Sequence, residues 1–203
     1  MATTVMTPIG TLNFPTLFEP RGNKANPSQE PRYSAMLLFD KAACQTSAYK
    51  DLQKAIQDCI VDKWGEAKAA DANFVKGLRS PLRDASEKTY SGFENGEIFL
   101  SAWSRGSDAA PGVLDLKGDN IIVPGDVFSG QLARFTVRPF AYDSNGNRGV
   151  SLGLEHVQVV KQDCERLDGR QSAAAAFGNG SDEQLAALGI SPEQTAPSEN
   201  LPF

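Results

Sequence analysis

The segment that most constrains the fold is a pair of extended stretches joined by a tight turn, between residues 129 and 161. It reads SGQLARFTVRPFAYDSNGNRGVSLGLEHVQVVK. The two central turn residues, Asn145 and Gly146, both tolerate the positive φ of a two-residue hairpin loop. The segment therefore predicts two long paired strands, and we expect a mainly β (α+β) protein.

Further strands are predicted nearer the N-terminus. Residues 11–41 read as two extended segments joined by a loop, because four prolines interrupt any helical pattern there. The run Tyr33 to Phe39 is apolar enough to be a strand buried on both faces. Residues 97–104, EIFLSAWS, predict another strand.

One main helix and one long connection complete this picture. Apolar residues recur at helical spacing over about 47–64, Thr46 or Ser47 can cap the start, and Gly65 ends the pattern. Residues 65–96 are polar and broken by glycine and proline, so they predict a long decorated excursion with little regular structure. Long ordered loops of this kind are often functional.

Length and composition agree with a globular protein without a membrane segment. The chain has 203 residues, of which 40% are hydrophobic, and no stretch approaches the roughly 18 apolar residues of a membrane span. The N-terminal MATTVMTPIG has neither the basic cluster nor the apolar run of a secretion signal. Three widely spaced cysteines, Cys44, Cys59 and Cys164, predict free thiols in a reducing cytosol.

The net charge of −5 does not exclude a polyanionic partner, because the charge is unevenly distributed. All 20 basic residues lie in residues 1–170, together with all but four of the 25 acidic residues. Residues 171–203 contain the remaining four acidic residues and no basic one. The body is therefore nearly neutral and can still hold a basic groove.

Nothing in the sequence indicates catalysis, a cofactor or a metal. The only histidine, His156, lies in a strand-like segment, where a structural role is the commoner one. The cysteines lack C-x-x-C spacing, and no phosphate-binding loop follows a strand. Acidic residues that could be imagined as a metal-dependent nuclease cluster lie in a turn-rich segment where aspartate is expected anyway: Asp108, Asp115, Asp119 and Asp126.

Binding has stronger support. Alternate residues of a strand share one face, and one face of residues 131–142 carries Arg134, Arg138, Phe140 and Tyr142. Guanidinium groups suit phosphates and rings suit bases, which is what a single-stranded nucleic acid offers. The plain alternative is a solvated sheet face, with Phe140 turned into the core. Pro139 predicts an edge or a bulge at this place, since proline cannot donate to a strand ladder.

Two other regions interleave basic and aromatic residues. Trp103 and Arg105 follow residues 97–102 of the predicted strand, and the excursion carries several more. These further candidates are Lys76, Arg79, Arg83, Lys88, Tyr90 and Phe93. In the excursion such residues suit a loop that closes over a nucleic-acid strand, or alternatively one whose aromatics pin it to the body.

Several pieces of the chain, taken in order, resemble a known family. They are FPTLFEP and PRYSAMLLFDK near the start, LRD at 82–84, YSG at 90–92, PGVLD at 111–115, residues 127–154 and LDGRQSAAAAF at 167–177. The chain resembles the bacteriophage single-stranded DNA-binding proteins with an OB-fold, in particular the enterobacterial phage branch.

The resemblance implies a five-stranded barrel with a helix between strands. It implies a protein that coats single-stranded DNA during phage replication or recombination, without catalysis, in the cytoplasm of the infected host. The groove of the family would be lined here by Arg134, Arg138, Phe140, Tyr142 and Trp103.

We expect two parts, an OB-fold domain over residues 1–170 and a flexible acidic tail over 171–203. The ending, SENLPF, resembles the C-termini of replicative single-stranded DNA-binding proteins. Phe203 supplies a ring and a carboxylate on one residue, which suits an apolar pocket with a basic rim. The predicted partner-binding residues are Glu199, Leu201, Pro202 and Phe203, and the expected partners are replication proteins of phage or host.

The sequence is also compatible with three further interpretations. A β-rich viral structural or assembly subunit would share the fold class and the loops. A metal-dependent nuclease is a second interpretation, and an RNA-binding barrel is a third, since base stacking does not distinguish RNA from DNA. The sequence leaves open as well whether the chain forms a homo-oligomer.

Overall fold

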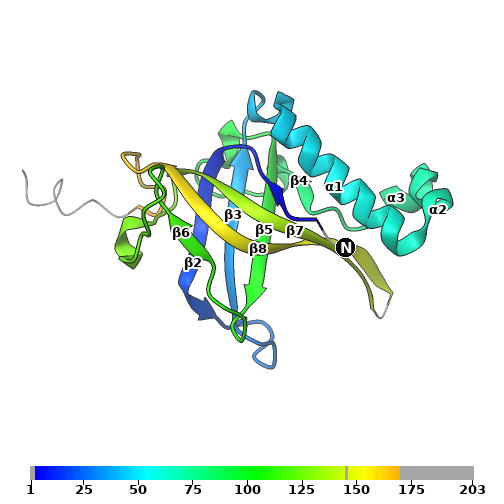
Figure 1. Ribbon diagram of the computed structural model, residues 1–203, viewed down its shortest axis with the longest axis horizontal. Helices are drawn as coiled ribbons and strands as arrows, with labels where there is room; N and C mark the ends of the chain where they lie inside the picture. Colours follow the sequence, from blue (N-terminus) through cyan, green and yellow to red (C-terminus); the bar gives the residue numbers. More distant parts are fainter. Residues whose placement is uncertain (1–2, 145, 170–203) are drawn as a thin grey trace, which may run out of the picture. The chain divides into compact units, whose positions relative to one another are not determined.

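A ring of five hydrogen-bonded strands forms the body of the protein (Figure 1). The computed structural model describes residues 3–144 and 146–169. The ring contains β2 (Gly10–Arg21), β3 (Arg32–Phe39), β5 (Ile98–Arg105), β8 (Asn147–Lys161) and β7 (Leu132–Ser144), paired in that order. Strand β7 closes the ring by pairing with β2. The expectation of a mainly β protein with a five-stranded barrel is confirmed.

Strand direction in the ring is antiparallel except at one pair. Strands β5 and β8 run parallel and pair only at Ala102 and Trp103. Three short strands lie outside the ring: β1 (Val5–Met6) pairs with β7, β4 (Leu82–Asp84) with β5, and β6 (Gly112–Leu114) with β8. These additions decorate the barrel without interrupting its closure.

The hairpin of β7 and β8 forms as predicted. Ser144 pairs with Asn147, and Gly146 has a φ of 78°. Asn145 lies outside the described residues. Alternate residues of β7, namely Ala133, Phe135 and Val137, are fully buried in the barrel, so the predicted division of this strand into an inner and an outer face holds.

Pro139 lies where a missing backbone donor is tolerated. The register of the hairpin shifts between Thr136 and Val137, and beyond Val137 no described strand other than β8 pairs with β7. Proline is confined to such edges and bulges because it cannot donate a ladder hydrogen bond. The prediction made from Pro139 is therefore confirmed.

The main helix, α1 (Ser47–Trp64), has the predicted boundaries. Thr46 caps it by accepting a hydrogen bond from the backbone N–H of Tyr49, and Gly65 ends it with a φ of 83°. Its apolar side packs against β7 and β1, with Leu52 fully buried. None of the helices in the described ranges is long and apolar enough to cross a membrane.

Two local expectations were only partly right. Residues 65–96 contain more regular structure than predicted, namely α2 (Glu66–Ala70), α3 (Ala72–Lys76) and β4, because α2 packs on α1, Asp71 caps α3 and β4 pairs with β5. Strand β3 is buried on both faces only near its end. Ala35 and Leu37 face the barrel interior, and Leu38 is buried on the outer side in a cluster with Phe93 and Phe99. Met36 on that side is only half-buried, since other segments cover only part of it.

Candidate nucleic-acid interface

A groove of about 630 Å³ crosses the outer face of β3, β5 and the β7–β8 hairpin. It combines aromatic and basic side chains, and its lining includes Arg79, Arg83, Lys88, Trp103, Tyr142 and Met36. Five of the predicted binding residues therefore meet in one place: Arg79, Arg83, Lys88, Trp103 and Tyr142.

The excursion reaches the groove because its backbone joins the barrel. The N–H of Arg79 donates to the carbonyl of Arg148, and the carbonyl of Arg79 accepts from the N–H of Val150, both at 3.0 Å. A few residues later β4 pairs with β5, with Arg83 opposite Phe99. The segment from Arg79 to Asp84 thus bridges β8 and β5 next to the end of their short parallel pairing, and it places its cations along one wall.

The approach of this segment to β8 requires a glycine. A Cβ atom at Gly149 would lie 2.5 Å from the carbonyl oxygen of Arg79 and 2.9 Å from its backbone nitrogen. Real Cβ contacts of that length essentially do not occur, so any larger residue must displace the Arg79 segment. Gly149 therefore allows the hairpin to contact the basic wall of the groove, which Arg79, Arg83 and Lys88 form.

Trp103 is held in one orientation by three neighbours. Its Nε1 donates to Ser151 Oγ at 3.0 Å, and Phe140 packs against it edge-on with ring centroids 5.7 Å apart. The guanidinium carbon of Arg32 lies 3.5 Å from its ring centroid. A ring fixed in this way is already arranged for stacking, so little rotational freedom is lost when a flat ligand binds.

Arg32 is a member of the site that the sequence did not indicate. It begins β3 and lies opposite Arg105 of β5, and burial lowers the pKa of its guanidinium. Its position over Trp103 depends on strand register, because Ser34 and not Arg32 pairs with Trp103. No local sequence pattern around Arg32 predicts its contact with Trp103.

Charges in the groove favour an anion modestly. Arg83 forms an ion pair with Glu87, four residues along the chain. Hydrogen bonds from Ser86 lower the pKa of Asp84, which keeps that carboxylate ionised. Within residues 3–144 and 146–169, Arg79 and Lys88 form no ion pair with a carboxylate. These two cations are the ones most available for phosphates.

The predicted row on β7 is divided. Arg134, Phe140 and Tyr142 are half-buried and Arg138 is exposed, so the parity of the strand is as expected. Of the four, Tyr142 lines the groove and Phe140 supports Trp103. Arg134 Nε instead donates to Gln158 Oε1, and Arg138 forms an ion pair with Glu155, both across the hairpin.

The remaining predicted residues differ in their surroundings. Phe93 is only 2% exposed and packs on Phe99, so it pins the excursion to the barrel and cannot stack on a base. Tyr90 is 41% exposed, next to Phe93. Lys76 and Arg105 are exposed, at the ends of α3 and β5, and neither lines the groove.

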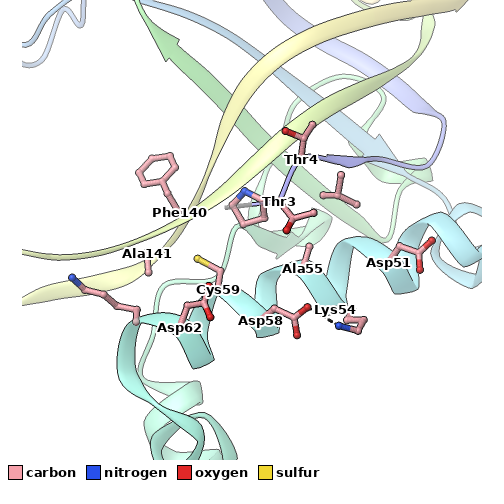
Figure 2. Close-up of a pocket in the computed structure, with 13 residues that line it drawn as sticks. Thr3, Thr4, Asp51, Lys54, Ala55, Asp58, Cys59, Asp62, Phe140 and Ala141 are labelled. Carbon is pink, nitrogen blue, oxygen red and sulfur yellow. Dashed lines mark hydrogen bonds and ion pairs between the residues drawn. The ribbon is translucent and has the colours of Figure 1, made fainter. Parts of the chain in front are cut away.

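A second hollow, of about 530 Å³, lies between α1 and β7 and is less suited to DNA (Figure 2). Three carboxylates line it, those of Asp51, Asp58 and Asp62, against two lysines, Lys54 and Lys63, and Lys54 is paired with Asp58. Burial raises the pKa of the Cys59 thiol, which also lines it. In Figure 2 the ring of Phe140 points away from α1. Because carboxylates outnumber ammonium groups in its lining, this hollow repels a polyanion more than it attracts one.

Residues considered for catalysis have structural partners. The Nδ1 atom of His156 accepts a hydrogen bond from the N–H of Gly112, and Asp115 Oδ1 accepts from the N–H groups of Lys117 and Asp119. In the part of the chain that the structure describes, no group of three or more potential ligands could hold a metal ion. The predicted tail residues Glu199, Leu201, Pro202 and Phe203 lie outside that part.

Comparison with known proteins connects this arrangement to one family. A family model described as Enterobacter phage Enc34, ssDNA-binding protein, matches residues 3–186. No curated protein sequence matches the chain.

Solved structures with the same fold carry similar descriptions. The single-stranded DNA-binding protein from bacteriophage Enc34 in complex with ssDNA has a TM-score of 0.63 and 19% identity, covering 80% of this chain and 88% of that one. The same phage protein in another structure has a TM-score of 0.62 and 20% identity, covering 86% and 89%. The single-stranded DNA binding protein gp2.5 of bacteriophage T7 has a TM-score of 0.51 and 13% identity over both full chains.

Proposed function

The chain belongs to the phage single-stranded DNA-binding protein family represented by Enterobacter phage Enc34, and on this premise we propose that it binds single-stranded DNA in the groove between Arg79 and Trp103. The observation that carries the proposal is the meeting of rings and cations there. Trp103 and Tyr142 come from the barrel, and Arg79, Arg83 and Lys88 from the excursion.

The chemistry of the groove matches an unpaired strand. Bases stack on aromatic rings with roughly 1–3 kcal/mol each, and cations track the phosphates. In a duplex the bases are paired and stacked on one another, so they cannot reach Trp103 or Tyr142. The protein therefore coats unpaired DNA during phage replication or recombination in the host cytoplasm, without catalysis.

A fluorescence titration with oligo-dT and with duplex DNA, at two salt concentrations, tests the proposal. We expect tighter binding of oligo-dT, with log K falling by about 0.7 per phosphate contact for each unit of log salt. Duplex bound as tightly as oligo-dT, or no binding of oligo-dT, would contradict it. Competition with an RNA of matched sequence shows whether the protein prefers DNA or RNA. An oligonucleotide that stays intact in Mg²⁺ or Mn²⁺ argues against a nuclease.

Glu87→Gln is expected to strengthen DNA binding by about three-fold at low salt, because it removes an anion beside the groove and frees Arg83 from its ion pair. The gain should shrink as salt rises, since screening weakens charge interactions. Anisotropy measurements with labelled oligo-dT at two salt concentrations check this. As a matched control, Asp58→Asn removes a carboxylate from the other hollow and should leave affinity unchanged.

For residues 171–203 we propose a regulatory and recruiting role as a flexible acidic tail. Their charge is opposite to that of the basic wall, and Phe203 adds a ring to a terminal carboxylate. A flexible linker of about thirty residues spans roughly 30 Å, which gives an effective concentration near the millimolar range at its own domain. The tail then occupies the groove weakly, and DNA displaces it so that Phe203 can bind a replication protein of phage or host.

Deleting residues 178–203 is expected to tighten oligo-dT binding several-fold at low salt and little at high salt, because the competitor is held mainly by charge. Titrations of the full and shortened chains check this. Equal affinities at low salt would contradict the competition for the groove. The recruiting role is tested separately, by binding of a replication protein to the full chain and to Phe203→Ala.

A further inference from the structure

Two exposed rings lie together outside the groove lining, and one of them has an unusual backbone. Phe14 in β2 is 48% exposed and has a φ of 49°, the only described residue other than glycine with a positive φ. Its ring meets that of Tyr90 edge-on, with centroids 4.9 Å apart. Neither ring is in the buried core.

The backbone around Phe14 is held on both sides. Its N–H donates to Ser129 Oγ at 3.0 Å, and the N–H of Gly130 donates to the carbonyl of Leu12 at 2.9 Å. Asn13 is 1% exposed, and the β2–β3 register shifts between Asn13 and Thr16. At this bulge Asn13 is buried and the neighbouring Phe14 is exposed.

This conformation is unfavourable for a bulky residue, whereas glycine or asparagine would adopt it readily. Such strain persists only where the surroundings enforce it, and it is concentrated at functional sites. Packing against Tyr90 accounts for only part of the Phe14 side chain, because about half of it is in water. The ring itself therefore needs an explanation.

The rings continue the groove at its β2 end. Asn13, next to Phe14, pairs with Met36 of β3, and Met36 pairs with Ser101 of β5. Met36 and Ser101 line the groove. Lys88 lines the groove too, and its Nζ is 5.6 Å from the centroid of the Tyr90 ring. Strands β2, β3 and β5 lie side by side (Figure 1), so the same outer surface carries both features.

The distance involved fits a short run of nucleotides. Strand β3 alone separates β2, which carries Phe14, from β5, which carries Trp103, so the two strands lie about 10 Å apart, which is room for one to two nucleotides of an extended strand. Tyr142 lies at the β7 end, Trp103 in the middle and Phe14 at the β2 end. Lys88 lines the groove beside the Tyr90 ring, where its ammonium can meet a phosphate of the same strand.

We propose that Phe14 and Tyr90 form a base-stacking subsite at the β2 end of the groove, which binds a base of the same DNA strand beyond Trp103. This inference rests on the proposed function. The hydrogen bonds around the bulge and the contact with Tyr90 hold the Phe14 ring exposed in the free protein, so the subsite exists before DNA arrives and binding does not have to order it.

The test compares Phe14→Ala, Phe14→Gly, Phe14→Tyr and Tyr90→Ala in the full chain, titrated with an oligo-dT of about twelve nucleotides. The alanine and glycine variants should bind about five- to ten-fold more weakly, with an unchanged salt slope, because a stack and not a charge is lost. Phe14→Tyr should bind like the parent chain. Ile122→Ala, which removes an apolar side chain that is 80% exposed in another loop, is the matched control and should have no effect.

Stability separates loss of the ring from loss of the fold. Phe14→Gly should melt about 2–4 °C above Phe14→Ala, because glycine relieves the strain at φ 49°. Equal weakening of DNA binding in both variants, despite their different stabilities, supports the subsite. If Phe14→Ala and Phe14→Gly both bind oligo-dT as tightly as the parent chain, while Trp103→Ala weakens binding, the subsite is overturned and the proposed function stands. A parent chain that does not bind oligo-dT overturns both.

Discussion

Trp103→Ala is expected to weaken binding of oligo-dT by about 30- to 150-fold while leaving the salt slope nearly unchanged. The indole is the largest ring in the groove, and Ser151, Phe140 and Arg32 hold it in place. Its removal takes away a stacking surface and also releases Arg32. The expected loss is therefore at the upper end of the range for a single stack.

The other tryptophan provides the control for this experiment. Trp64 packs on Phe74 at the end of α1, with ring centroids 5.7 Å apart, and does not line the groove. Trp64→Phe should retain both affinity and the fluorescence change on titration, whereas Trp103→Phe should lose most of the fluorescence change. If Trp64→Phe abolished the signal and Trp103→Ala bound normally, the groove would be the wrong site.

Gly149→Ala is expected to destabilise the protein by about 1–3 kcal/mol and to weaken DNA binding as well. The added methyl group meets the backbone of Arg79, which is held by hydrogen bonds and cannot move aside as a flexible side chain would. The φ of Gly149 is not in the positive range, so the effect is steric. Displacement of Arg79 from the groove wall should also flatten the salt slope.

Urea denaturation together with titrations at two salt concentrations measures both effects. Gly22→Ala and Gly125→Ala are matched controls, because an added Cβ at either position meets nothing within 4 Å. Both should be as stable as the parent chain and bind DNA equally well. A Gly149→Ala variant with the stability and salt slope of the parent would show that the excursion does not depend on this close approach.

Elements with strong local signals were predictable from the sequence. Helix α1 has the predicted boundaries because its apolar spacing, the cap at Thr46 and the stop at Gly65 agree with one another. The hairpin was predictable because Asn-Gly selects a tight turn. The burial of β3 was not predictable, since the exposure of Met36 depends on which segments cover the barrel. The parallel pairing of β5 with β8 was not predictable either, because it joins strands about fifty residues apart.

The candidate site was partly predictable for the same reason. The outer face of β7 follows from strand parity, but the partners of Arg134 and Arg138 come from β8, so register decides that neither guanidinium is free. Aromatic and basic residues in the excursion were identified as a set, and only the structure separates Arg79 in the groove from Phe93 in the core. Phe14 had no signal of its own, because a bulge is a property of two strands.

The parallel pairing of β5 with β8 determines when the groove can exist. Strand β8 is the last of the described strands, and it supplies Val150, Ser151 and the backbone that holds Arg79. Contacts between distant segments form late and slowly in folding. A growing polypeptide on the ribosome therefore has no complete groove until translation has passed β8.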